Sequence, residues 1–121
     1  MKMFVKKLLD CPEFIAGDNT LLREILHPNK QDIDLKYSFA HAIVKPGLTT
    51  YLHALKTSEI YYILEGKGEM QIDGEKQILE VGDTVYIPPN AKQCITNISN
   101  IDLKFICIVD PAWREEDETV Y

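Results

Sequence analysis

A histidine and a glutamate stand six residues apart in the middle of the chain, among segments rich in β-branched and aromatic residues. They are His53 and Glu59, and glycines flank the pair at Gly47 and Gly66. An imidazole and a carboxylate held close together can share a proton or bind one metal ion. This pair is therefore the first candidate for chemistry in the sequence.

A second set of residues with regular spacing follows the first, at Gly82, Pro88 and Asn97. Taken together, the two sets resemble the two sequence motifs of the cupin superfamily. The resemblance implies an all-β fold, the double-stranded β-helix or cupin jelly-roll barrel, with a small-molecule pocket inside it. We therefore expect one cupin domain over residues 1–121, with its core at about 36–110 and an acidic C-terminal tail at 111–121.

The resemblance also implies a divalent-metal site with a reduced set of ligands. In cupins two histidines and a glutamate of the first motif and a histidine of the second bind the metal. His53 and Glu59 match this pattern, whereas Leu55 and Gln93 occupy the other two positions, and Asn90 replaces a motif glycine. The implied ligands are His53, Glu59 and Gln93. Imidazole suits Fe, Ni and Zn, while carboxylate and amide oxygens suit harder ions such as Mn.

The sequence leaves three functions open for such a pocket. The first is a metal-dependent enzyme or metal-binding protein that acts on a small metabolite. The second is a metal-free enzyme like a sugar isomerase or epimerase, in which His53 is a general base oriented by Glu59 and Tyr61 is the acid. The third is a non-catalytic ligand-binding module. In a purely structural interpretation, His53 is a core histidine satisfied by Glu59, and Gln93 is a hydrogen-bonding amide.

Short β-type runs separated by Gly, Pro, Asn and Asp must position these residues. Their spacing is typical of an all-β sandwich or barrel. The predicted strands are Thr20–Leu26, Tyr37–Lys45, Thr49–Leu55, Glu59–Leu64, Lys67–Ile72, Lys76–Val81, Thr84–Ile87, Lys92–Ile98 and Asp102–Val109. A weak helical pattern covers Met3–Leu9. Because side chains alternate along a strand, Tyr61 should point inward with Glu59, and Tyr51 inward with His53.

Composition narrows the function classes. The 121 residues are 45% hydrophobic and 26% charged, as in an ordinary globular domain. A net charge of −6 with no basic stripe argues against nucleic acid and anionic membranes as partners. No apolar run is long enough to span a membrane, and the N-terminus lacks the features of a signal peptide, so we expect a cytoplasmic protein. Exposed strand edges need cover, which favours a homodimer.

The C-terminal tail and the other histidines complete the predictions. Trp113 is the only tryptophan, and we expect it to pack on the barrel with the acids after it near the pocket mouth. The alternative is a solvated acidic tail or one packed on a partner subunit. His27 should be solvated beside a proline turn, and His41 should be a structural or surface residue.

Overall fold

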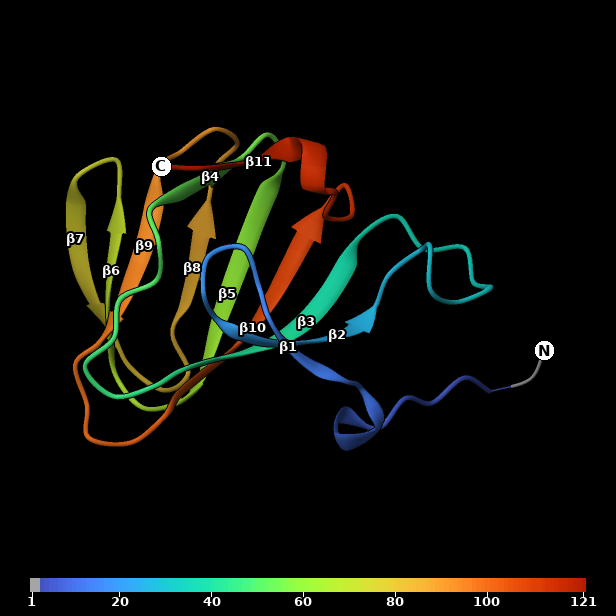
Figure 1. Cartoon of the computed structure of the whole chain (residues 1–121), viewed down its shortest axis with the longest axis horizontal. Coiled ribbons are helices and arrows are strands. Elements are labelled where there is room, and N and C mark those ends of the chain that lie inside the picture. Colours follow the sequence, from blue (N-terminus) through green and yellow to red (C-terminus); the bar gives the residue numbers. More distant parts are fainter. Residues whose placement is uncertain (1–2) are drawn as a thin grey trace.

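A computed structural model describes residues 3–121, and strands form almost all of its regular structure (Figure 1). The strands are β1 (Glu13–Ile15), β2 (Leu21–Leu26), β3 (Ser38–Val44), β4 (His53–Leu55), β5 (Ser58–Glu65), β6 (Gly68–Ile72), β7 (Glu75–Leu79), β8 (Thr84–Ile87), β9 (Gln93–Asn97), β10 (Leu103–Asp110) and β11 (Glu118–Val120). Two short 3₁₀ helices, η1 (Leu8–Asp10) and η2 (Glu115–Asp117), interrupt them. Within the described residues, no helix has the length and apolar character needed to cross a membrane.

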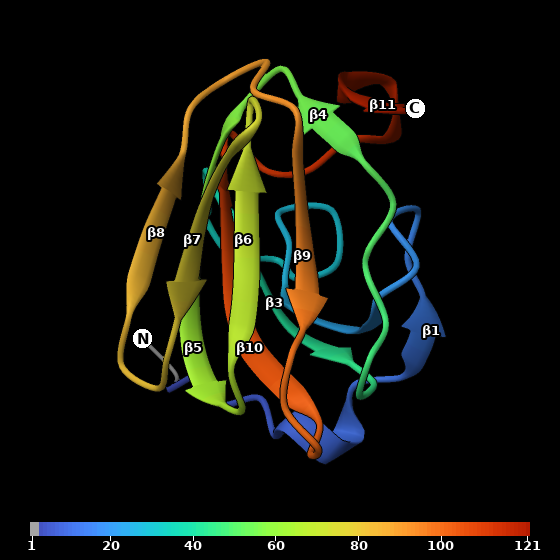
Figure 2. The same ribbon diagram turned by 90° about the vertical axis from the view of Figure 1, so that its left-hand side faces the viewer.

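The strands form two antiparallel sheets that face each other, as Figure 2 shows with the five-stranded sheet in front. The order of the larger sheet is β1-β2-β3-β10-β5-β8, and that of the smaller is β11-β4-β9-β6-β7. Several neighbours, such as β3 and β10 or β4 and β9, come from distant parts of the chain, as a jelly-roll topology requires. The predicted all-β fold, a double-stranded β-helix, is confirmed.

Alternation along the strands builds the core between the sheets. In β5, Glu59, Tyr61 and Ile63 are buried, while Ile60 and Tyr62 between them are exposed. The inward positions of β3, β6, β9 and β10 meet those of β5. The buried hydrophobic cluster consists of Ala42, Val44, Tyr61, Ile63, Met70, Leu79, Ile87, Ala91, Ile95, Leu103, Phe105 and Cys107. The predicted inward orientation of Tyr61 is therefore confirmed.

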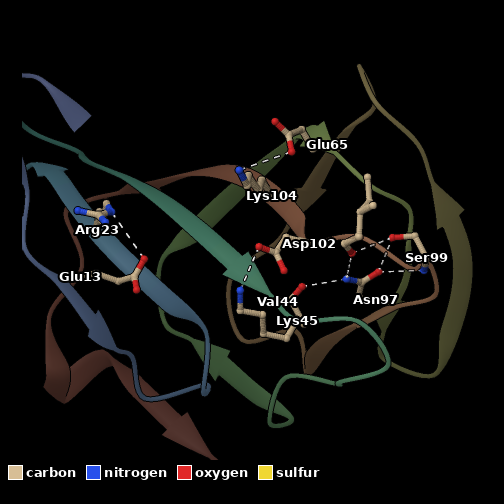
Figure 3. A network of polar contacts seen from close by, with 10 residues as sticks. Glu13, Arg23, Val44, Lys45, Glu65, Asn97, Ser99, Asp102 and Lys104 are labelled. Atoms are coloured by element: carbon tan, nitrogen blue, oxygen red, sulfur yellow. Dashed lines mark hydrogen bonds and ion pairs between the residues drawn. The ribbon is translucent and has the colours of Figure 1, made fainter. Parts of the chain in front are cut away.

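The motif residues outside the candidate site hold the turns of the barrel. The Asn97 amide donates to the backbone oxygens of Val44 and Ile101 at 2.9 and 2.7 Å, and its oxygen accepts from Ser99 (Figure 3). Gly66 has φ +83°, and a Cβ there would come within 2.9 Å of the backbone oxygen of Asp102. Both residues fix the loop before β10, so their role is structural.

Asn90 stands where the cupin motif has glycine, and its backbone explains why the exchange is tolerated. Its φ is +67°, in the left-handed region. Asparagine adopts this region at lower cost than most residues, because its short polar side chain can bond locally. The turn before β9 therefore keeps the conformation that a glycine would give it.

Several strand and helix predictions differ from the structure. Met3–Leu9 is not an α-helix, and only η1 at its end is helical. The predicted strand Thr49–Leu55 is regular only in β4, so Tyr51 lies in an irregular segment and is exposed instead of inward. The short strands β1 and β11 were not predicted, and they lie outside the expected core of residues 36–110.

The C-terminal segment folds onto the barrel instead of extending into solvent. Strand β11 pairs with β4, and the two lie side by side at the top of Figure 1. The Trp113 backbone N–H donates to Ser38 Oγ, and its backbone oxygen accepts from His27 Nε2 at 2.8 Å. His27 is consequently buried, so the prediction that it is solvated is wrong. The physical reason is the tail, which covers a residue that the local sequence places in a turn.

Candidate functional site

His53 opens β4 and points into the space between the sheets, where 3% of its surface is exposed. Its Nδ1 lies 2.8 Å from Glu118 Oε2 on β11. With Nδ1–H donating to this carboxylate, the ring is held in one orientation. Its other nitrogen, Nε2, is buried without a hydrogen-bond partner, and Asp18 Oδ2 is 3.6 Å away.

Glu59 lies on the opposite sheet and is also buried. Gln93 Nε2 donates to Glu59 Oε1 at 2.8 Å, and the backbone of Gln93 pairs with that of His53 in the sheet register. The Gln93 amide oxygen is buried and has no partner. The structure therefore brings together the three predicted residues His53, Glu59 and Gln93, with Gln93 bonded directly to Glu59.

A cavity of about 510 Å³ opens beside these groups. Its wall includes His53, Glu59 and Tyr61, but Gln93 is not part of the wall and supports Glu59 from behind. The Tyr61 ring packs against Phe105 with their centroids 4.4 Å apart. The remaining wall is largely apolar and comes from β1, β2, β3, β10 and the C-terminal segment. A concave, mainly apolar pocket with a few convergent polar groups is the usual form of a small-molecule site.

Burial and neighbouring charges shift the protonation of the polar groups. Desolvation raises the pKa of Glu59 to about 7, even though the Gln93 hydrogen bond and the nearby His53 favour its charged form. Burial alone would lower the pKa of His53, but the Glu118 hydrogen bond and the charges of Asp18 and Glu59 outweigh it, so that this pKa is raised above 6.5. The pKa values of both groups in this pocket are therefore raised, that of Glu59 to about 7.

Tyr61 is less suited to proton transfer than its position suggests. Desolvation, reinforced by the charge of Glu59, raises the pKa of its phenol well above 10. The hydroxyl therefore stays neutral over the physiological range and acts as a hydrogen-bond donor or acceptor in the pocket wall.

The donors around His53 provide a limited set for a divalent metal ion. In residues 3–121, no group of three or more His, Cys, Asp or Glu side chains is placed to hold one. Leu55 is buried beside His53 and cannot donate. The candidate donors for a metal are His53 Nε2, the Glu59 carboxylate and Gln93 Oε1, and two of these atoms, His53 Nε2 and Gln93 Oε1, are buried without partners. The His53–Glu118 hydrogen bond is also the contact that commonly orients a metal-bound histidine.

The structure adds two carboxylates to the site, Asp18 and Glu118, that the sequence does not single out. Asp18 lies in the turn after β1, where Oδ1 accepts from the N–H and the hydroxyl of Thr20. Glu118 comes from the acidic tail, which was expected to reach the pocket mouth without a particular acid being identified. No local pattern distinguishes either residue, because long-range pairing places both. His41 lies on β3 between two residues of the pocket wall and so points away from the pocket.

Comparison with known proteins identifies the family. Residues 40–109, more than half of the chain, match the family model described as the cupin domain. The chain is a cupin. An uncharacterized protein of Methanocaldococcus jannaschii is 46% identical to this cupin over 108 residues, which are 88% of this chain and 86% of the relative.

Other relatives carry names that refer to different ligands. The oxalate-binding protein of Thermotoga maritima is 32% identical over 72 residues, 59% of this chain and 60% of that protein. The mannose-1-phosphate guanylyltransferase of Escherichia coli is 29% identical over 104 residues, 81% of this cupin. This cupin spans only 22% of the length of that enzyme.

Solved structures agree with the fold at low sequence identity. A Cupin 2 conserved barrel domain protein from Salinispora arenicola superimposes with a TM-score of 0.79 at 18% identity, over 96% of this cupin and 92% of that chain. Streptomyces Pac13 in complex with uridine has a TM-score of 0.79 at 20% identity, over 100% and 92% of the respective chains. At these sequence identities the structural similarity shows a shared fold.

The raised pKa of Glu59 predicts how stability depends on pH. The folded protein keeps the Glu59 proton up to about pH 7, whereas the unfolded chain loses it near pH 4.5, so raising the pH between these values destabilises the fold. Glu59→Gln should remove this loss, which is on the order of 3 kcal/mol. Urea unfolding of parent and variant at pH 5, 6, 7 and 8 measures it.

Glu75→Gln is the matched control, because Glu75 is exposed on β7. The control should follow the parent at every pH. If the curves of Glu59→Gln and the parent run parallel from pH 5 to pH 8, Glu59 does not hold its proton in the folded protein.

Proposed function

We propose that the pocket binds a small metabolite and that His53 and Glu59 transfer protons to and from it. The observation that carries the proposal is the state of His53. Its Nδ1 is bonded to Glu118, while Nε2 is buried without a hydrogen-bond partner beside an open cavity. A buried polar atom of this kind needs a partner, and a ligand in the cavity can supply one.

The proposed chemistry is acid–base catalysis of an isomerisation, an epimerisation or a loss of water. One of the two groups removes a proton from the ligand, and the other returns a proton to a second atom of it. The pKa of Glu59, raised to about 7, lets this group hold or release a proton near neutral pH, and the raised pKa of His53 favours the protonated imidazole, which can give a proton to the ligand. Glu118 orients the imidazole and stabilises its protonated form, and the Tyr61 hydroxyl can bond a ligand oxygen.

Proteins with this fold provide precedent for such chemistry. Pac13 is described as a nucleoside dehydratase. Removal of water from a metabolite needs a group that takes a proton and one that gives a proton, which His53 and Glu59 provide in this cupin. Since the two sequences share 19% identity, the precedent concerns the fold and the type of reaction.

Exchange in heavy water tests this function. The protein is incubated in D2O with a panel of neutral sugars and nucleosides, and proton NMR follows exchange, isomerisation and loss of water. We expect one compound to react, and we expect His53→Asn to reduce its rate at least about 100-fold. Glu118→Gln should also slow it, whereas Glu116→Gln, two residues away and exposed, should not. Reaction at the parental rate in His53→Asn contradicts the assignment, and binding without reaction across the panel favours a ligand-binding module.

A divalent metal is a second candidate for the same site, favoured by the partnerless atoms His53 Nε2 and Gln93 Oε1. When bound to His53, Glu59 and Gln93, a metal ion such as Mn, Fe, Ni or Zn would polarise a ligand oxygen. The chain's own residues would still orient the ligand and exclude water.

Metal binding is tested by calorimetric titration of protein purified without chelator or nickel resin. Leu55→His should raise the affinity for Zn²⁺, because it adds the donor that the leucine position lacks. His53→Ala should abolish binding. Equal affinity in the parent and both variants means that these residues do not hold the metal.

A homodimer through the outer face of the larger sheet is our proposal for quaternary structure. In the strand register, Ile108 on β10 lies between Phe39 on β3 and Ile60 on β5, and Ile60 lies beside Tyr86 on β8. Tyr86 is 59% exposed and Ile60 36%. An apolar row across four strands fits a second copy of the same row, which a two-fold axis brings face to face.

Ile60→Asp should convert the dimer to a monomer, because it buries a charge in this contact. Light scattering should give twice the chain mass of 13.9 kDa for the parent and the chain mass for the variant. Ile78→Asp is the control, since Ile78 is exposed on the smaller sheet and should leave the dimer intact. A parent that elutes and scatters as a monomer contradicts the proposal.

A further inference from the structure

The pocket wall carries many more acidic groups than basic groups. Five carboxyl groups belong to its wall, and among the described residues no lysine or arginine does. His53 is the single basic group there. The carboxyl groups are those of Asp18, Glu24, Glu59, Glu115 and Glu118.

Nearby cations neutralise only part of this charge. Lys30 Nζ lies 3.0 Å from Glu24 Oε1, and the His53 ring bonds Glu118 at 2.8 Å. Asp18 is bonded to the N–H and hydroxyl of Thr20, which carry no formal charge. Asp18 Oδ2 also lies 3.6 Å from His53 Nε2, so one imidazole faces both Asp18 and Glu118. Among the described residues, Asp18, Glu59 and Glu115 have no lysine or arginine partner.

The negative charge of the wall determines which ligands can enter the pocket. An anionic ligand that leaves water needs opposite charges or several donors to replace its hydration, and arginine or lysine usually supply them. Here a carboxylate or phosphate group would instead face several carboxylates that have no lysine or arginine partner. A positively charged group would be attracted by the same carboxylates.

The uncharged part of the wall indicates the rest of the ligand. Phe14, Tyr61, Phe105 and Trp113 contribute aromatic rings from four separate segments. Aromatic faces pack against flat or apolar bodies, and they also attract cations. The wall therefore suits a ring with hydroxyl or amino groups.

We infer that this pocket selects a neutral or cationic organic molecule with a ring or apolar body, and that it excludes carboxylates and phosphate esters. The inference rests on the proposed function, since it concerns the ligand of the same pocket. It separates this cupin from its relative named as an oxalate-binding protein, because oxalate is a dianion.

Cys107 offers a direct probe of the charge inside the pocket. It lies in the wall, 7% exposed, and burial together with the charges of Glu59 and Asp18 raises the pKa of its thiol. Methanethiosulfonate reagents transfer their thioalkyl group to a thiolate, forming a disulfide and releasing methanesulfinate. A trimethylammonium-ethyl, a sulfonato-ethyl and a methyl reagent supply a cation, an anion and a neutral probe.

The experiment compares the rates at which these reagents label Cys107 in the folded protein at pH 8.5, with the labelled peptide identified by mass spectrometry. Each rate is divided by the rate of the same reagent with 2-mercaptoethanol. Because the thiol pKa affects all three reagents alike, the ratio of cationic to anionic rates reports the potential. We expect a ratio of at least about 10.

A matched pair of variants assigns the effect to the pocket wall. Glu115→Lys should lower the ratio several-fold, because Glu115 belongs to the wall. Glu116→Lys changes the same charge at the neighbouring exposed residue outside the wall and should leave the ratio near that of the parent.

The outcomes distinguish the charge inference from the proposed function. If the neutral reagent labels Cys107 but the cationic and anionic reagents react equally, or the anionic one faster, the pocket is open and the charge inference is wrong. If even the neutral reagent fails to label Cys107 when the pH is raised from 8.5 to 10 to ionise more of the thiol, the pocket does not admit small molecules, and the proposed function fails together with the inference.

Discussion

The hydrogen bond between His53 and Glu118 is the contact on which the site depends. It joins β4 to the C-terminal strand β11, and so it orders the last segment of the chain as well as the imidazole. It also opposes the desolvation of His53, and together with the charges of Asp18 and Glu59 it raises the pKa of a histidine that is 3% exposed. This interaction therefore fixes the orientation of the imidazole and favours its charged form.

The apolar core of the barrel offsets the cost of burying the polar groups of the pocket. The core away from the pocket includes Ile63, Ile95 and Leu103, each with no exposed surface. Packing of such side chains supplies the favourable free energy that offsets desolvation of Glu59 and Gln93. The turns held by Asn97 and Gly66 lie away from the pocket and keep the strands in register without taking part in ligand binding.

Much of the barrel could be predicted from the sequence because local patterns encode it. Alternation along β5 predicted that Glu59 and Tyr61 share one face, and the spacing of turn residues predicted an all-β fold. The same reasoning failed for Tyr51, since the strand that would have turned it inward begins only at His53. His27 was misjudged because the backbone of Trp113, far along the chain, buries it.

The candidate site was predictable only in part, because local patterns indicate the strand residues but not the residues that long-range contacts bring in. His53, Glu59 and Gln93 lie in strands whose register follows from the barrel, so their meeting could be expected. Asp18 and Glu118 come from a turn and a tail, where no periodicity indicates which side chain points inward. Their contribution depends on contacts with His53, which lies 35 residues after Asp18 and 65 residues before Glu118. These contacts become visible only in the folded protein.

The two ends of the chain therefore have a role distinct from that of the middle. The family match covers residues 40–109, whereas Asp18, Trp113 and Glu118 lie outside it and still form part of the pocket wall. Substitutions in these end segments can reshape the pocket while the strands that give the barrel its rigidity stay unchanged. The division separates what must be preserved for folding from what is free to vary. It gives evolution, or a protein engineer, a way to change the ligand by exchanging two short segments on a constant frame.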